Sequence, residues 1–335
     1  MAIILRVFSF WLIGLMIILF ISGDRQSLNR WDSGHFLGIA ENGYRFEFQY
    51  AFFPLFPLLI NAFSNIFNIP FIFSGVLVNF SSTILIIFFL YKLLEKEFKK
   101  EIAIKSVVAF LLFPASFFLL TPYSESVFIL FVILSSLFLQ RKKYLFVSIF
   151  VILACLTRLA GVALIPAVLL EVYLIKKKTK DMYFLLLLPL GLLIYVSYLY
   201  INTGHPFYFL EAEKYWKRDL TIPGAGIVIT IEEFIKTQEF QKLIDLLFTI
   251  FGIGLVLRSI KFLKPSFAMY GVISLLLPLF TPTLSSMPRF LLPIFPIFIL
   301  IGLIKNKYIY TIYIFISTIL MVYFAATFFS GGWVA

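Results

Sequence analysis

Apolar stretches of membrane length recur from one end of the chain to the other, and short polar segments separate them. Because a spanning segment must satisfy its backbone hydrogen bonds internally, the pattern predicts an all-α, polytopic integral membrane bundle with about eleven crossings. We treat residues 1–335 as one domain. The expected spans are residues 3–21, 69–91, 104–120, 127–139, two in 141–176 that meet at a bend near Thr157 to Gly161, 183–201, 243–260, 267–280, 290–304 and 308–328.

Two long polar segments are predicted to be external loops that carry short interfacial helices. Residues 23–68 form the first, in which Pro54 and Pro57 make an apolar stretch a poor continuous helix, suited to lie at the interface or to dip into the membrane. Residues 202–242 form the second. Between Ile231 and Glu239 its apolar and charged positions fit a short amphipathic helix on the membrane surface.

Composition narrows the class of protein. Hydrophobic residues make up 61% of the chain and charged residues 13%, which excludes a disordered protein, a disulfide scaffold and an ordinary soluble enzyme. The net charge of +11 would suit a nucleic-acid binder if it were spread evenly. Instead, Lys and Arg cluster at the ends of apolar runs, so the positive-inside rule places these clusters and the N-terminus in the cytoplasm. We expect an uncleaved first helix, contacts with membrane lipids and no nucleic-acid partner.

A carboxylate follows the first apolar segment, in the sequence Arg30-Trp31-Asp32-Ser33-Gly34-His35. This segment resembles the first external loop of the GT-C superfamily of lipid-linked sugar transferases, and it is most similar to prokaryotic-type members of the PIG-V mannosyltransferase family (GPI mannosyltransferase II-like). Two features depart from the family pattern: His205 stands where an Asp is commoner, and Leu159 and Ala160 replace polar residues of eukaryotic members. Four further blocks that resemble the family follow in order: Phe113–Ser116 with Pro122–Ser126, Thr157-Arg158 with Gly161, Gly204–Phe207 with Trp216 and Arg218, and Met287–Leu291 through Phe295-Pro296.

The resemblance implies a GT-C glycosyltransferase that transfers a sugar, mannose in this family, from a dolichyl- or polyprenyl-phosphate donor. The acceptor is a hydroxyl group of a lipid or glycan on the external face, and the anomeric carbon is inverted. Asp32 is the expected general base. The residues expected to bind substrate are Arg30, Trp31, His35, Tyr123, Glu125, Arg158, His205, Trp216, Arg218 and Arg289.

The chemistry of this transfer suits one carboxylate and several arginines. The acceptor hydroxyl must lose a proton as it attacks, whereas the phosphate leaves as a stable anion without an acid, so one positioned carboxylate suffices. Glycoside hydrolysis, by contrast, shares the work between two carboxylates. Arginine holds a phosphate with a planar fork of donors. The sequence has no Asp-x-Asp motif, no P-loop and no cage of acidic ligands, so we expect no cofactor, no metal site and no sugar-nucleotide donor.

Other interpretations remain open. The same fold class serves other GT-C activities, such as transfer of a modified sugar to lipid or of a sugar to protein. A lipid-sugar flippase or transporter is a non-enzymatic alternative, although the sequence has no visible half-repeat of the kind that is typical of transporters. Individual residues also have structural explanations. Asp32 could cap the N-terminus of a helix, and Glu125 could be an acid that reaches the membrane interface. Arg289 could anchor a helix end among the lipid headgroups. The two histidines suit loop hydrogen bonds, and Trp31 and Trp216 suit the interfacial aromatic belt. Arg158 is the hardest to explain structurally, because a charge at the bend of an apolar hairpin needs a partner.

Overall fold

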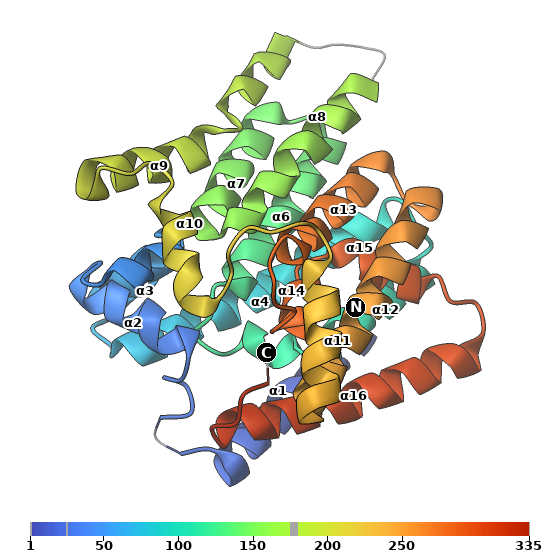
Figure 1. The fold of residues 1–335 in the computed structure, drawn as a ribbon. Coiled ribbons are helices and arrows are strands. Elements are labelled where there is room, and N and C mark those ends of the chain that lie inside the picture. Colours follow the sequence, from blue (N-terminus) through green and yellow to red (C-terminus); the bar gives the residue numbers. More distant parts are fainter. Residues whose placement is uncertain (1, 25, 175–179, 335) are drawn as a thin grey trace.

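The computed structural model describes residues 2–24, 26–174 and 180–334, in which the secondary structure is helical throughout (Figure 1). Short 3-10 helices (η) join or extend many of the α-helices. In chain order the elements are α1 (Ala2–Ser22), α2 (Asp32–Asn42), η1 (Glu47–Ala51), α3 (Leu55–Phe67), α4 (Phe71–Glu95), α5 (Lys100–Leu111), η2 (Ser116–Leu119), α6 (Glu125–Gln140), α7 (Tyr144–Thr157), η3 (Leu159–Ala163), α8 (Leu164–Leu174), η4 (Lys180–Leu187), α9 (Leu190–Thr203), α10 (Tyr208–Glu213), η5 (Lys214–Trp216), α11 (Ala225–Thr237), α12 (Phe240–Phe262), α13 (Pro265–Leu279), α14 (Met287–Leu291), α15 (Phe295–Gly302) and α16 (Lys307–Phe329).

Five helical segments of the described chain are long and apolar enough to cross a membrane: α1, α4, α12, α16 and the combined segment Lys180–Thr203. They indicate a multi-pass membrane protein, in agreement with the expected class. Three expected spans are not single helices, however. The helices break near Pro114, Pro189 and Pro293, because proline has no N–H to donate and its ring obstructs the preceding turn.

The expected interruption of the apolar stretch after residue 51 was wrong, whereas its place at the membrane interface stays a prediction. Helix α3 runs without a break from Leu55 to Phe67, although Pro54 and Pro57 stand at its start. Pro54 precedes the helix and Pro57 lies in its first turn, where backbone N–H groups have no partner within the helix. The prolines therefore mark where this helix begins and do not interrupt it.

The core is formed by helices that are covered on most sides. Helix α6 contacts α4, α7 and α8, and α15 is buried along its whole length against α5. A Cβ on Gly302 would lie 2.9 Å from the backbone oxygen of Ile102, so the close approach of α15 to α5 favours glycine at this position. A buried hydrogen bond from Arg289 to Glu125 joins the short helix α14 to the beginning of α6.

The bend expected near Thr157 to Gly161 is confirmed. Helix α7 ends at Thr157, Arg158 is extended (φ −156°, ψ 149°), and the chain continues into η3 and α8. A Cβ on Gly161 would lie 2.5 Å from the backbone N of Cys155, so the chain can fold back this tightly only because position 161 is glycine. From this bend the Arg158 side chain reaches Ser124 and Glu125 at the start of α6.

The segment after α1 meets the segment after α16. Ser27 Oγ donates a hydrogen bond to the carbonyl oxygen of Phe329 at 2.7 Å, and the rings of Trp31 and Trp333 pack edge to face with centroids 4.8 Å apart. Helix α11 lies against α12 and α13 and overlaps the short helix expected between Ile231 and Glu239, but it begins at Ala225 and ends at Thr237. Helices α2, α3 and α10 lie to one side of the bundle (Figure 1). The residues after α16 therefore come close to the sequence that contains Asp32.

Candidate active site

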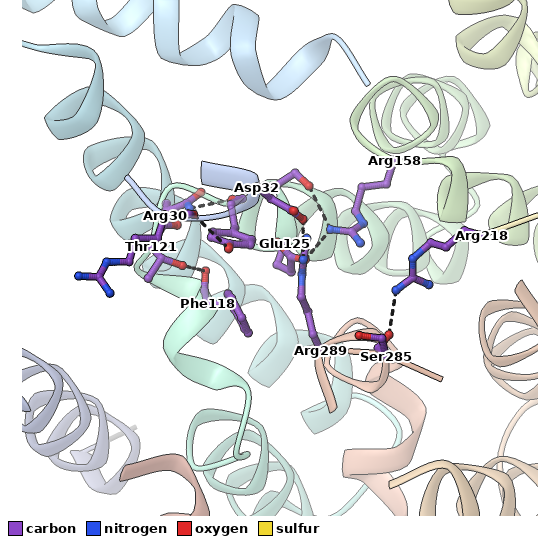
Figure 2. A network of polar contacts seen from close by, with 12 residues as sticks. Arg30, Asp32, Phe118, Thr121, Glu125, Arg158, Arg218, Ser285 and Arg289 are labelled. Carbon is purple, nitrogen blue, oxygen red and sulfur yellow. Dashed lines mark hydrogen bonds and ion pairs between the residues drawn. The ribbon is translucent and has the colours of Figure 1, made fainter. Parts of the chain in front are cut away.

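Four charged side chains from distant parts of the chain meet in one network (Figure 2). Asp32 begins α2, Glu125 begins α6, Arg158 lies at the bend after α7, and Arg289 lies in α14. Both carboxylates stand in the first turn of a helix, where the positive end of the helix dipole stabilises negative charge. Folding therefore gathers two acids and two arginines that are up to 257 residues apart in sequence.

Glu125 holds the two arginines together. Its side chain is fully buried, and Oε1 accepts hydrogen bonds from Arg158 Nη1 and Arg289 Nε, each at 2.5 Å. A buried carboxylate is stable only when it is paired, and here two guanidinium groups pair with it. The interpretation of Glu125 as an exposed interfacial acid does not fit this geometry.

Arg289 is the centre of the network. Its Nη1 donates to Asp32 Oδ2 at 2.6 Å while Nε binds Glu125, and its guanidinium lies 4.6 Å from the centroid of the Tyr123 ring. Within the described residues, Nη2 of Arg289 and both Nε and Nη2 of Arg158 make no hydrogen bond. These unused donors are the ones available to an anion.

Asp32 is held on one side only. Oδ2 accepts the hydrogen bond from Arg289, whereas Oδ1 makes no hydrogen bond to the described part of the chain. Burial by itself raises the pKa of Asp32, but the charge and hydrogen bond of Arg289, with a smaller contribution from Arg158, outweigh burial and lower the pKa below its usual value. Asp32 is therefore ionised at neutral pH and has one oxygen free to accept a proton.

Three members of the network line a cavity of about 300 Å³. Asp32, Arg158 and Arg289 face the cavity, and so do Trp216 and Arg218. The remainder of the lining is mostly apolar, with Phe52, Leu159, Leu277 and Phe290 among its members. A cavity of this size with convergent charges in an apolar wall is typical of a small-molecule site. Among the described residues, no group of three or more His, Cys, Asp and Glu side chains could hold a metal ion.

Three other residues expected at the site support its walls. Arg218 donates from Nη2 to the carbonyl oxygen of Ser285 at 2.8 Å, so it also holds the loop that leads into α14. Tyr123 packs against Arg289, as described above. The ring of His35 packs against Trp216 and Phe52, and burial lowers the pKa of His35.

Three further expected residues lie outside the cavity lining, as do Tyr123, Glu125 and His35. Arg30 turns away from the network and pairs with Asp24 at 2.5 Å (Figure 2). His205 lies exposed on the turn between α9 and α10, beside Thr203. Trp31 packs against Trp333, which itself lines the cavity. Any role of these three residues in binding substrate stays a prediction.

The sequence did not indicate three residues of the site region. Glu213 and Trp333 line the cavity, and Asp245 of α12, although only 2% exposed, accepts a hydrogen bond at 3.1 Å from the backbone N–H of Met287, the first residue of α14. An acidic residue in a long apolar helix is a signal that could have found Asp245. Glu213 and Trp333 stand among other polar or aromatic residues, and their sequence surroundings do not distinguish them.

A known protein family matches the part of the chain that contains Asp32, Glu125 and Arg158. The family profile described as Mannosyltransferase (PIG-V) matches residues 16–196, more than half of the chain. Over 40 residues the chain is 52% identical to the GPI alpha-1,6-mannosyltransferase 2 of Mus musculus and 50% identical to that of Homo sapiens, and each match covers 12% of this chain and 8% of the relative. The chain thus matches only a small part of these curated relatives.

Among solved structures, an oligosaccharyltransferase of Archaeoglobus fulgidus aligns with 96% of this chain and 55% of its own, at 12% sequence identity and a TM-score of 0.48. The assignment rests on the family profile, which extends from α1 into α9 and includes Asp32, Glu125 and Arg158. The chain belongs to the PIG-V mannosyltransferase family.

Proposed function

We propose that this protein transfers mannose from a polyprenyl- or dolichyl-phosphate donor to an acceptor hydroxyl of a lipid or glycan, with Asp32 as general base. The observation that carries the proposal is the cavity that Asp32, with one oxygen free of hydrogen bonds in the described chain, lines together with arginines from two other elements. This transfer requires a base and a set of cationic donors that bind the phosphate. Asp32 and the two arginines, Arg158 and Arg289, provide these groups in one cavity.

In the proposed reaction, Asp32 accepts the proton of the acceptor hydroxyl as its oxygen attacks the anomeric carbon. The bond from that carbon to the phosphate oxygen breaks, and the phosphate leaves with the bonding electrons. Because attack comes from the side opposite the leaving group, the product has inverted configuration. The proton on Asp32 is then lost to water.

Arg158 and Arg289 are proposed to bind the donor phosphate through the guanidinium nitrogens that have no partner in the described chain. The leaving phosphate gains negative charge as the bond breaks, so these contacts strengthen in the transition state. Glu125 keeps both arginines in place while their outer edges remain available. It is therefore proposed to position the arginines and not to contact the sugar.

The proposal is tested by transfer in proteoliposomes. Purified protein receives mannose-labelled polyprenyl phosphate together with lipids extracted from a strain of the source organism that lacks this gene, which supply the natural acceptor. We expect labelled product to form, and product with retained anomeric configuration would contradict the mechanism. Movement of intact labelled donor across the bilayer without any product would favour the flippase alternative.

The proposal includes about eleven crossings, a cytoplasmic N-terminus and a cavity that opens to the external face. Exposed side chains in the described structure offer a test: Gln26 and Glu41 belong to predicted external segments, and Lys142 and Lys307 to predicted cytoplasmic ones. Cysteine introduced at Gln26 or Glu41 should react with an impermeant thiol reagent added to intact cells, whereas cysteine at Lys142 or Lys307 should react only after lysis. The native Cys155 is buried and contributes little background. The reverse pattern would place the site on the cytoplasmic side.

A further inference from the structure

A second carboxylate, Glu213, lines the cavity that contains Asp32. Glu213 ends α10, and the chain passes through η5 and a left-handed residue, Lys217 (φ 57°), before it reaches Arg218. The backbone N–H of Arg218 donates to the Glu213 carbonyl oxygen at 3.2 Å and closes this turn. One short segment therefore presents Glu213, Trp216 and Arg218 to the cavity together.

The carboxylate of Glu213 has no partner within the described residues. It makes no hydrogen bond and no ion pair there, in contrast to Asp32 and Glu125, which both hold Arg289. The guanidinium of Arg218 binds the Ser285 carbonyl oxygen and lies over the ring of Phe290 at 4.7 Å. Burial raises the pKa of the Glu213 carboxyl group. An unpaired acid in a partly buried position costs stability, and a ligand that donates hydrogen bonds would supply its missing partner.

The surroundings of Glu213 indicate which ligand groups would bind there. A phosphate is disfavoured next to a carboxylate, and the cavity offers it the unused donors of Arg158 and Arg289 instead. Hydroxyl groups are favoured, because an ionised carboxylate only accepts hydrogen bonds and a sugar hydroxyl donates them. Trp216, three residues further along, adds an aromatic ring with apolar faces and a polar edge.

We infer that Glu213 binds hydroxyl groups of a pyranose ring in the cavity, with Trp216 beside it. The inference rests on the proposed transferase function and adds a sugar-binding residue to it. Two sugars can supply these hydroxyls: the mannose of the donor or a sugar of the acceptor. The chemistry at Glu213 is the same for both, and kinetics distinguish them.

The test compares Glu213→Gln and Glu213→Ala with wild type and with a matched control, Glu211→Gln. Glu211 lies in the same helix but is exposed and pairs with Lys214, so its variant should behave as wild type. Each protein is assayed in proteoliposomes with mannose-labelled polyprenyl phosphate and titrated lipid extract from the deletion strain. We expect Glu213→Ala to raise the KM for either the donor or the lipid extract about tenfold or more. The loss of a hydrogen bond to a charged group costs about 1.5–3 kcal/mol. Glu213→Gln should have a smaller effect, because its amide oxygen still accepts a hydrogen bond.

The thermal midpoint, Tm, separates binding from a structural role. Because Glu213 has no protein partner in the described chain, Glu213→Gln should keep or raise the Tm even as KM rises. A raised KM for the labelled donor would assign Glu213 to the donor mannose, and a raised KM for the extract would assign it to the acceptor. Unchanged values of both KM, or a fall in Tm that accounts for the lost activity, would overturn the inference while the transferase function stands. A wild-type protein that forms no product would contradict both this inference and the proposed transferase function.

Discussion

Replacing Asp32 by Asn should reduce mannose transfer by about a hundred- to ten-thousand-fold, the range typical of the loss of a general base. Asparagine has nearly the same shape, and its side-chain oxygen can still accept the hydrogen bond that Arg289 donates at 2.6 Å. The substitution therefore removes the proton acceptor with little change in the shape of the cavity. The KM for the lipid-linked donor should stay close to the wild-type value, so the loss should appear in kcat.

Asp24→Asn is the matched control for this experiment. Asp24 precedes the same helix α2, is exposed and pairs with Arg30, which points away from the cavity. Its variant should transfer mannose at a rate close to that of wild type. Near-normal turnover of purified Asp32→Asn protein would remove Asp32 from its proposed role and make Glu213 the next candidate for the base.

Replacing Arg289 by Lys should lower kcat by about a hundred- to a thousand-fold, as the loss of one preorganised donor to a developing negative charge typically does. The ammonium group of lysine is a point charge and cannot hold Glu125 and Asp32 in the two directions that the planar guanidinium reaches. The variant should therefore also raise the KM for the donor. Arg289→Ala should be worse, because it leaves buried Glu125 with one arginine fewer, and loss of one member of a buried ion pair costs about 3–5 kcal/mol.

The alternative for Arg289 is an anchor in the lipid headgroup layer, where lysine serves as well as arginine. Arg258→Lys is a matched control, because Arg258 is exposed on α12 and its guanidinium lies over the ring of Phe262. Transfer kinetics should distinguish the two positions: Arg258→Lys should resemble wild type and Arg289→Lys should not. Wild-type kinetics in both variants would support the anchor and contradict the phosphate clamp.

Much of the fold could be predicted from the sequence, because the apolar character of one continuous segment is enough to indicate a membrane helix. A helix in a membrane satisfies its backbone within its own segment, so apolar length predicts where helices such as α1, α4, α12 and α16 lie. The bend near Arg158 could also be predicted, because the basic clusters at residues 141–143 and 176–180 require the apolar run between them to cross the membrane twice. Proline was harder to interpret. The same residue that ends a helix near Pro189 lies in the first turn of α3 at Pro57, and only the position within the helix separates the two cases.

The residues of the site were only partly predictable. The motif around Asp32 led to the family, and the order of the later blocks pointed to Glu125, Arg158 and Arg289. Motif membership did not show which side chains face the cavity: Arg30 stands two positions before Asp32 and yet turns away to Asp24. Glu213 was missed because nothing in its neighbourhood differs from an ordinary polar loop.

The sequence by itself determined the helical class, most of the helix positions and the family, since each depends on residues that are near one another in the chain. Only the tertiary structure decided that Arg289 binds both Glu125 and Asp32, that Asp245 supports the start of α14, and that Glu213 shares their cavity without a protein partner in the described chain. These contacts join residues 42 to 257 positions apart. Their formation depends on how α2, α6, α12 and α14 pack, and packing is set by the shapes of many side chains at once, which no local pattern of polarity contains.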